Sequence, residues 1–250
     1  MAQGILAVAG GTGLVGSMVV AEAQRRGYDV RVLSRGTGVD LTSGDGLAAV
    51  LENVETVIDT SNVVTMAKGP ALRFFEQATA NLLAAEQAAG VGHHVALSIV
   101  GCDQVDLGYY FGKRRQEELV REGAIPWTIL RATQFHEFAG QMVDRSPAPF
   151  ALGLRMRTQP IAAAEVATHL VDTVERGPAG LLPDLGGPEE LRMDRMMRQW
   201  LRATGRRRLL VPVPMAGKAG RQVDAGGLLP GPGATLAGVT FAEWLAASAG

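Results

Sequence analysis

The sequence predicts an α/β fold in which a doubly wound parallel sheet is followed by a small, loop-rich C-terminal lobe. Short apolar runs alternate with longer amphipathic runs through the first 131 residues, and glycines stand where the longer runs end. After residue 131 this rhythm changes, and stretches rich in glycine and proline appear at residues 147–160 and 177–188. This alternation of strand-length and helix-length runs is typical of a parallel sheet with helices on both faces.

The predicted strands are short and almost wholly apolar, as strands buried on both faces are. We expect them at residues 5–9, 29–33, 56–59, 95–98 and 127–130. The predicted helices are longer, and a glycine follows each of them, because glycine readily adopts the left-handed conformation that ends a helix. These helices cover residues 14–26, 72–89 and 109–121, and they stop at Gly27, Gly90 and Gly123.

The change of pattern after Arg131 predicts two domains. Residues 1–131 form the sheet domain, whereas residues 132–250 form mainly the lobe, apart from a helix at about 162–175 that returns to the sheet domain. Residues 226–233 are too rich in glycine and proline for regular structure. Open α/β sheets hold ligands at the carboxyl ends of their strands, so we expect a small-molecule substrate to bind between the strand ends and the lobe.

Composition and charge exclude several classes of protein. Hydrophobic residues make up 47% of the 250 residues and charged residues 20%, which is enough apolar material for a buried sheet and too little charge for a disordered chain. The formal net charge is -1, so neither a nucleic acid nor an anionic membrane is expected as a partner. We interpret the basic run Arg206, Arg207 and Arg208 as a solvated helix end or turn.

Cys102 is the only cysteine, which excludes an internal disulfide and a multi-cysteine metal cage. His93 and His94 have no carboxylate or cysteine at metal-ligand spacing, so no metal site is expected. No uncharged stretch approaches membrane-spanning length, and the apolar run 5–9 is too short for a signal peptide. The sequence therefore predicts a cytoplasmic protein and leaves its oligomeric state open, a homodimer included.

Glycines at fixed spacing join the first predicted strand to the first predicted helix. The run from Gly10 to Gly16, GGTGLVG, matches the fingerprint of dinucleotide-binding folds. Glycine lets the backbone approach a pyrophosphate, while the helix N-terminus offers free N–H groups and a positive dipole end. A purely structural turn would share the pattern, but its place between a buried strand and a helix favours phosphate binding. We expect a Rossmann-type core whose cofactor contacts here are Gly10, Thr12, Gly13, Leu14, Val15 and Gly16.

The end of the second predicted strand indicates which dinucleotide binds. An NAD site usually has an Asp or Glu there for the ribose hydroxyls, but this chain has Ser34 and Arg35, the latter 19 positions after Gly16. A guanidinium can bind a 2′-phosphate with a planar fork of donors, so we expect NADP(H) as the cofactor. The alternative for Arg35 is a surface arginine without a ligand. Asp40 could contact the adenine edge, and a plain turn aspartate is an equal alternative.

A tyrosine and a lysine at i,i+4 spacing begin the predicted helix 109–121. Tyr109 and Lys113 share one helix face, and a nearby ammonium shifts the pKa of a phenol toward the range that a general acid or base needs. Ser98 ends the preceding strand, where it can hydrogen-bond a substrate oxygen. We interpret the three as a hydride-transfer site in which Tyr109 exchanges a proton, Lys113 also holds the cofactor ribose, and Ser98 orients the substrate. The alternative is a chance pairing on a helix surface.

Two further groups of residues follow predicted strand ends. Thr60, Ser61 and Asn62 are expected to flank the ribose or nicotinamide, with a simple polar turn as the alternative. Gln134, Phe135, His136 and Phe138 follow the strand 127–130, where the lobe begins, and are candidates for the substrate pocket. A lone histidine such as His136 is more often a loop or packing residue.

These motifs resemble those of the short-chain dehydrogenase/reductase superfamily, and more narrowly its atypical, NmrA-like branch of NAD(P)-binding proteins. The resemblance rests on the glycine turn, on Ser98, on Tyr109 with Lys113, and on the run PWTILRATQF at residues 126–135. It extends to the segments at residues 184–190 and 240–245, and so covers nearly the whole chain. The resemblance implies a Rossmann fold, a small C-terminal substrate lobe and NADP(H) as the usual ligand.

Two functions of different classes follow from this resemblance. The first is an NADP-dependent oxidoreductase acting on a small, largely apolar carbonyl, enone or quinone-like substrate. The second is a dinucleotide-binding sensor without turnover, because some members of this branch bind the cofactor without chemistry and keep the lysine more reliably than the tyrosine. This chain has both residues, which favours the enzyme. An epimerase or dehydratase that uses bound cofactor is a third alternative.

Overall fold

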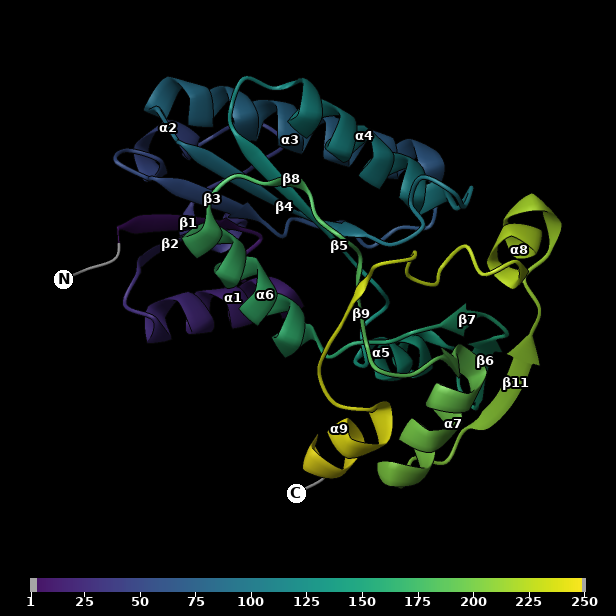
Figure 1. Cartoon of the computed structure of the whole chain (residues 1–250). Coiled ribbons are helices and arrows are strands. Elements are labelled where there is room, and N and C mark those ends of the chain that lie inside the picture. Colours follow the sequence, from purple (N-terminus) through teal and green to yellow (C-terminus); the bar gives the residue numbers. More distant parts are fainter. Residues whose placement is uncertain (1–3, 249–250) are drawn as a thin grey trace. The chain divides into compact units, whose positions relative to one another are not determined.

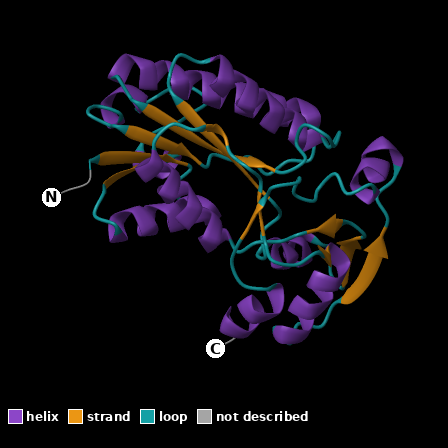
Figure 2. Ribbon diagram, viewed as in Figure 1, coloured by secondary structure: helices purple, strands orange, loops and turns teal. Residues whose placement is uncertain are grey.

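The computed structural model of the chain describes residues 4–248, and its contacts divide them into two compact units. Unit 1 comprises residues 4–98, 107–131 and 166–182, and unit 2 comprises residues 99–106, 132–165 and 183–248. Figure 1 labels the elements in chain order, and Figure 2 separates strands from helices.

The sheet of unit 1 has the strand order β2-β1-β3-β4-β5, with β8 beside β5. β1 pairs in parallel with β2 and with β3, β3 pairs in parallel with β4, and β5 with β8, so that Val8 lies opposite both Val32 and Ile58. β1 lies next to the edge strand β2, and β3, β4 and β5 follow in order on its other side. The strand bounds are Ile5–Ala9, Asp29–Leu33, Thr56–Asp59, His93–Ile99, Trp127–Ala132 and Gly180–Leu181 for β1 to β5 and β8.

Helices cover both faces of this sheet, with α2, α3 and α4 on one face and α1 with α6 on the other (Figure 1). Their bounds are Leu14–Arg25 for α1, Leu47–Val50 for α2, Lys68–Ala89 for α3, Gly108–Glu122 for α4 and Ala163–Arg176 for α6. A 3-10 turn, η1, spans Arg35–Thr37. The predicted doubly wound α/β fold is therefore confirmed.

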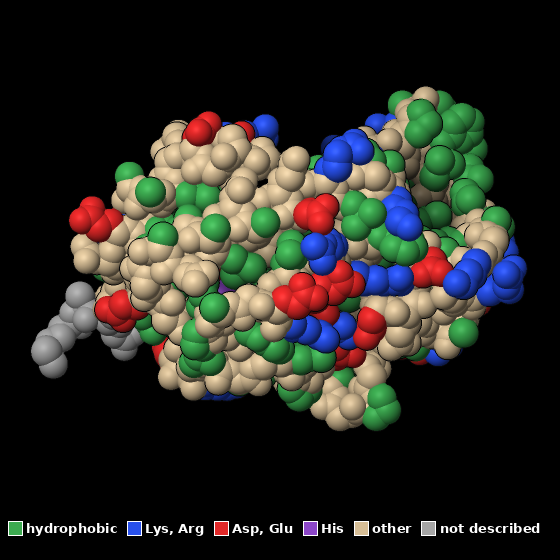
Figure 3. Space-filling model, turned by 90° about the horizontal axis from the view of Figure 1, so that it is seen from above, with side chains coloured by type: hydrophobic (Ala, Val, Ile, Leu, Met, Phe, Trp, Pro, Cys, Tyr) green, Lys and Arg blue, Asp and Glu red, His purple; other side chains and the backbone are tan. Residues whose placement is uncertain are grey.

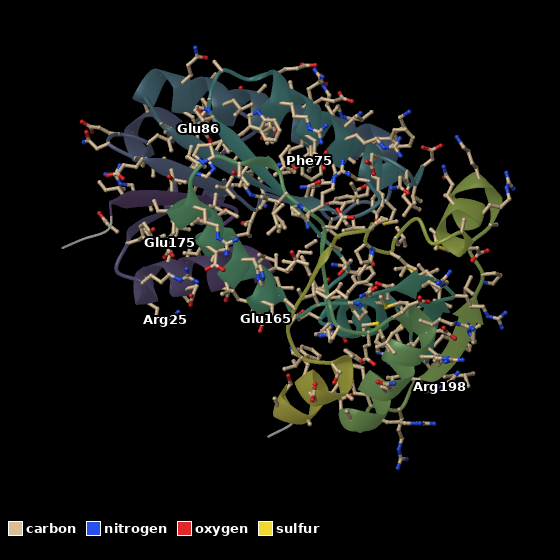
Figure 4. The ribbon with its side chains drawn as sticks, viewed as in Figure 1. Arg25, Phe75, Glu86, Glu165, Glu175 and Arg198 are labelled. Atoms are coloured by element: carbon tan, nitrogen blue, oxygen red, sulfur yellow. The ribbon has the colours of Figure 1, made fainter. Side chains whose placement is uncertain are left out.

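Close packing of α3 against α4 depends on a glycine at their crossing. A Cβ added to Gly112 would lie 2.6 Å from the Phe75 ring and 2.8 Å from the carbonyl oxygen of Ala71, so no larger residue fits. Phe75, labelled in Figure 4, is fully buried. On the outer surface of these two helices, Arg115 pairs with Glu76 and Glu118. Acidic and basic side chains are interspersed on the face of the molecule that Figure 3 shows. Gly112 thus allows α4 to pack closely against α3.

Two elements of unit 1 begin two or more residues earlier than the sequence predicted. α3 begins at Lys68, not at residue 72, because Pro70 occupies the first helical turn, where its missing N–H has no intrahelical acceptor to lose. β4 begins at His93, not at residue 95, and both histidines are buried within the strand. His94 Nδ1 lies 2.9 Å from a carboxylate oxygen of Glu86. Burial raises the pKa of the Glu86 carboxyl, and the contact with His94 opposes that shift.

Unit 2 contains more regular structure than the sequence indicated. β6 (Phe150–Leu154) pairs in parallel with β11 (Leu209–Val213), and β7 (Arg157–Thr158) pairs antiparallel with β10 (Leu191–Arg192). β9 (Leu185–Gly186) pairs in parallel with β12 (Thr235–Leu236). The helices of this unit are α5 (Phe138–Arg145), α7 (Met193–Ala203), α8 (Gly217–Asp224) and α9 (Phe241–Ser248).

The core of unit 2 forms around α7, which buries Met193, Met196 and Met197 completely. α7 packs against α5 and β6, and Gly140 on α5 lets the Trp200 ring approach, since an added Cβ there would be 2.9 Å from a ring carbon. Residues 226–233 carry no helix or strand, as the sequence predicted.

Candidate functional site

The glycine turn lies between the end of β1 and the start of α1, and two of its glycines are required by the fold itself. Gly10 has a φ of +71°, in the left-handed region, and a Cβ there would meet the backbone of Ser61 at 2.9 Å. A Cβ on Gly16 would lie 2.2 Å from the carbonyl oxygen of Gly10 and 2.7 Å from Oγ1 of Thr60. These two glycines therefore bring α1 close to the carboxyl ends of β1 and β3.

Gly13 differs, because a side chain at this position would crowd only one backbone oxygen. Its φ is -78°, and an added Cβ would meet only the carbonyl oxygen of Gly10, at 3.2 Å. Gly13 and its neighbour Thr12 are exposed. A glycine that the fold requires less than Gly10 or Gly16, at an exposed turn, fits a position that a ligand's phosphate approaches closely.

The first turn of α1 has the properties of an anion site. Gly13 is the N-cap and offers no side-chain cap, and no acidic residue stands in the first turn. The first N–H groups of a helix have no intrahelical acceptor and carry the positive end of the helix dipole. The N–H groups of Leu14, Val15 and Gly16 therefore suit a pyrophosphate, and this arrangement fits a bound dinucleotide.

The turn after β2 holds Arg35 at the surface with its side chain uncommitted. The Ser34 N–H donates to Oγ1 of Thr37 at 3.1 Å, which fixes the turn, while the exposed side chain of Arg35 makes no hydrogen bond or ion pair within residues 4–248. Arg31 is in contrast occupied, since its Nη1 donates to the carbonyl oxygens of Val50 and Glu52 at 2.7 and 2.5 Å. Of these two arginines, Arg35 is the one available to a 2′-phosphate.

Asp40 lies in a turn stabilised by its own side chain. Its Oδ1 accepts hydrogen bonds from the hydroxyl of Thr42 at 2.6 Å and from the Thr42 N–H at 2.8 Å. These hydrogen bonds hold the pKa of the Asp40 carboxyl below its usual range, with a smaller contribution from Arg35. This is the turn aspartate that the sequence left as an alternative, and a contact with adenine stays a prediction.

The loop after β3 brings Asn62 to the hydroxyl of Tyr109. Tyr109 is half-buried in the first turn of α4, and its hydroxyl donates to Oδ1 of Asn62 at 2.8 Å. The Thr60 hydroxyl donates to the carbonyl oxygen of Ala9 at 2.8 Å, and the Ser61 N–H donates to Oδ1 of Asp59 at 2.8 Å. The loop is thus tied to β1 and β3, next to the glycine turn, and it holds the Tyr109 hydroxyl there.

Lys113 is buried on the same face of α4 and is fixed by two acceptors. Its Nζ donates to the carbonyl oxygen of Leu97 at 2.6 Å and to Oε1 of Gln116, whose Nε2 in turn donates to Oδ2 of Asp59 at 2.8 Å. The Lys113 Nζ lies 4.8 Å above the Phe75 ring, and the Tyr109 ring packs edge-on against the same phenyl group at 5.6 Å. Phe75 therefore supports both residues, as the i,i+4 spacing predicts.

Gln116 and Asp59 are functional candidates that the sequence analysis missed. Asp59 is 1% exposed at the carboxyl end of β3, and Gln116 is likewise buried on α4. Together they connect the ammonium of Lys113 to the loop that carries Asn62. The signal was present: Gln116 follows Lys113 by three positions, on the same helix face, and a carboxylate at a buried strand end needs a partner.

Ser98 is buried and donates to a carboxylate inside unit 1. Its hydroxyl lies 2.6 Å from Oε1 of Glu117, which the guanidinium of Arg131 holds with two hydrogen bonds of 2.8 and 2.7 Å. Arg121 adds a third contact to this carboxylate at 2.9 Å. Ser98 is thereby held in a buried ion-pair network, and its contact with a substrate stays a prediction.

The four candidates for the substrate pocket all lie in unit 2. Oε1 of Gln134 accepts a hydrogen bond from the Thr158 hydroxyl. His136 is fully buried between Phe241 and Trp244, and its Nε2 lies 3.2 Å from the carbonyl oxygen of Val239. Burial lowers the pKa of His136.

His136 therefore occupies the packing position that the sequence left as its alternative. Phe135 and Phe138 are half-buried, and Phe138 begins α5. Substrate contacts by these four residues stay predictions. Residues 4–248 contain no cluster of three histidine, cysteine or acidic side chains that could hold a metal ion, and no helix among them is long and apolar enough to span a membrane.

Comparison with known sequences gives one family and one curated relative. Residues 10–176 match a family described as NAD(P)H-binding. The chain is also 32% identical over 142 residues to a (4-alkanoyl-5-oxo-2,5-dihydrofuran-3-yl)methyl phosphate reductase from Streptomyces griseus. That match covers 52% of this chain and 48% of the reductase, so the chain spans about half the length of this relative.

Comparison with solved structures gives the same fold over nearly the whole chain. MoeE5 in complex with UDP-glucose and NAD has a TM-score of 0.74 and 18% identity, and the alignment covers 98% of this chain and 97% of MoeE5. A short-chain dehydrogenase/reductase superfamily protein from Agrobacterium tumefaciens with bound NAD has a TM-score of 0.69 and 20% identity, with 98% and 96% covered. At these identities the likeness establishes the fold alone.

Proposed function

Because this chain belongs to the NAD(P)H-binding family, we propose that it is an NADP-dependent oxidoreductase of the short-chain dehydrogenase/reductase type. Its substrate is a small, largely apolar carbonyl, enone or quinone-like compound, to or from which the nicotinamide transfers a hydride. The observation that carries the proposal is the position of the Tyr109 hydroxyl, 2.8 Å from Asn62, in the same unit as the glycine turn.

The chain's own residues take distinct roles in this proposal. Tyr109 exchanges a proton with the substrate oxygen, since its hydroxyl is half-buried and already oriented by Asn62. Lys113 binds the ribose and lends positive charge to the Tyr109 region, and the contacts to Leu97 and Gln116 keep its ammonium in place. Ser98 contributes a hydroxyl to the substrate side, and its partner Glu117 sets its orientation.

Preference for NADP over NAD rests on the turn after β2. The exposed guanidinium of Arg35 is the charged side chain that this turn offers, and Asp40 is engaged by Thr42. A 2′-phosphate gains a charge-assisted contact here, whereas a ribose diol finds no carboxylate to accept its hydrogen bonds within residues 34–39.

The name of the Streptomyces griseus relative supports the substrate class. It describes a reductase whose substrate carries an unsaturated, oxo-substituted ring, an alkanoyl group and a methyl phosphate, so the name supports the conjugated carbonyl part of the proposed class and not its apolar character. The match covers half of each chain, so we take from it the compound class and not the compound. We also propose a cytoplasmic location, because Cys102 is the only cysteine and the chain can form no internal disulfide.

The alternative is an NmrA-like sensor that binds the dinucleotide without turnover. It shares the glycine turn, Arg35 and Lys113 with the enzyme and differs in giving Tyr109 no chemical task. We propose to separate the two with NADPH carrying deuterium at its transferable position and a panel of enones, quinones and aldehydes. The enzyme transfers deuterium to a product carbon of an enone or aldehyde, and it reduces a quinone to a hydroquinone with oxidation of NADPH. Tight NADPH binding with neither labelled product nor substrate-dependent NADPH oxidation across the panel would favour the sensor.

A further inference from the structure

Five arginines gather around one open pocket in unit 2. Arg198 and Arg202 lie on α7, and Arg206, Arg207 and Arg208 follow its end, all lining a cavity of about 710 Å³. Arg198 is labelled on α7 in Figure 4. This volume lies within the range of small-molecule sites. The basic run interpreted from sequence as a solvated turn is therefore part of a concave surface, which we call the arginine pocket.

Little within the described chain neutralises these charges. Arg206 pairs with Asp144 and lies over the Trp200 ring at 5.1 Å. Among residues 4–248, none of the other four arginine side chains of the pocket makes a hydrogen bond or an ion pair. Arg198 and Arg202 stand four positions apart on one helix face, where like charges repel. An anion in the pocket would relieve this repulsion.

Arg208 supplies the observation that points to a bound ligand. Its Nη1 is buried and has no hydrogen-bond partner in the part of the chain that the structure describes. Buried donors without a partner are rare, because each one loses its water without gaining an acceptor. Arg208 lines the pocket, so the head group of a single molecule bound there would lie beside its guanidinium.

An apolar strip begins at the wall of the same pocket. Leu209 is 62% exposed and lies directly opposite Phe150 in the β6–β11 pairing, while Val211 lies opposite Leu152. All four side chains are exposed, and alternation along each strand places them on one face. An exposed apolar strip of paired side chains marks a binding surface, and here it continues from a cationic head-group site.

We propose that the arginine pocket and this strip form a binding site for one amphiphilic phosphate monoester. The phosphate binds the arginines, whose planar forks match its three oxygens, and the aliphatic chain lies along Leu209 and Phe150. The site is built from residues of unit 2 alone, whereas the glycine turn belongs to unit 1. It takes a single molecule of ligand for each chain.

The test uses n-octyl phosphate below its micelle concentration, titrated by calorimetry into the full chain. We expect one binding event for each chain, weakened about tenfold or more by Arg208→Gln, because a charge-assisted contact is lost. Arg195→Gln is the matched control, since Arg195 is an exposed α7 arginine that does not line the pocket, and it leaves the affinity unchanged. Circular dichroism of each variant checks that it is folded.

Further arms separate this site from other sources of phosphate binding. Leu209→Asn should weaken n-octyl phosphate several-fold and leave the weaker binding of inorganic phosphate unchanged. Gly13→Val, which blocks the dinucleotide turn, should leave n-octyl phosphate bound. Equal affinity in wild type and a folded Arg208→Gln would overturn the proposal. So would binding to phosphatidylglycerol vesicles with none to monomeric n-octyl phosphate, since a membrane surface would then be the partner.

Discussion

The two kinds of glycine in the phosphate turn should respond oppositely to a side chain. Gly13→Val places a branched side chain on an extended, exposed N-cap where the nearest non-neighbour is the carbonyl oxygen of Gly10, at 3.2 Å from Cβ. We expect its free energy of unfolding to stay within about 1 kcal/mol of wild type. Its affinity for NADPH should fall at least roughly a hundredfold, because two or more charge-assisted phosphate contacts of about 1.5 kcal/mol each are lost.

Gly16→Ala is the matched opposite. Its Cβ would lie 2.2 Å from the Gly10 carbonyl oxygen and 2.7 Å from Oγ1 of Thr60, so α1 must move away from β1 and β3. Overpacking of this kind costs about 1–3 kcal/mol of stability. Urea denaturation measures the stability of both variants, and calorimetric titration with NADPH measures binding. A folded Gly13→Val chain that binds NADPH as tightly as wild type would refute the placement of the cofactor at this turn.

Three further predictions concern charge. Arg35→Asp should reverse the cofactor preference and lower the ratio of NADPH affinity to NADH affinity by roughly ten- to a hundredfold, since a carboxylate repels the 2′-phosphate. A wild type that binds NADPH and NADH equally would contradict the role of Arg35. Glu117→Gln should lower the free energy of unfolding by about 3 kcal/mol, because the buried Arg131 loses the carboxylate with which it pairs. An unchanged midpoint of urea denaturation would show that this ion pair does not stabilise the fold. Burial lowers the pKa of His93 to about 4, below the unfolded value of 6.5, so the unfolded chain binds a proton first as the pH falls. This histidine should therefore cost about 2 kcal/mol of stability between pH 7 and pH 5, and His93→Gln, measured by urea denaturation at both values, should remove that part of the pH dependence.

The strands and helices of unit 1 could be predicted because their signals are local. Each strand is a short apolar run, and a positive-φ glycine such as Gly90 marks a helix end. The predicted start of α3 was late because Gly69 and Pro70 suggest a break, although both are tolerated in a first helical turn. The pairing of β6 with β11 joins segments more than fifty residues apart, and nothing local in the sequence reports it.

The sequence predicted which residues belong to the candidate site, but only some of the contacts that they make. The spacing of Tyr109 and Lys113 placed both on one face of α4, against Phe75. The hydrogen bond from Tyr109 to Asn62 and that from Ser98 to Glu117 connect different elements, so they depend on tertiary packing that periodicity does not encode. The Arg206–Arg208 run shows the converse case, in which a common surface pattern takes part in a pocket that only the fold assembles.

The measurement that bears most directly on the enzymatic proposal is the single-turnover rate of Tyr109→Phe with NADPH and the best substrate of the panel. The substitution removes one hydroxyl, so NADPH affinity should stay within about twofold of wild type while hydride transfer slows by about 10²–10⁴-fold, the usual loss for a missing general acid. Tyr28→Phe, which removes a hydroxyl just before β2, at the opposite edge of the sheet, is the control and should keep the wild-type rate. A Tyr109→Phe chain that transfers hydride at the wild-type rate would contradict the role of this tyrosine as the proton donor.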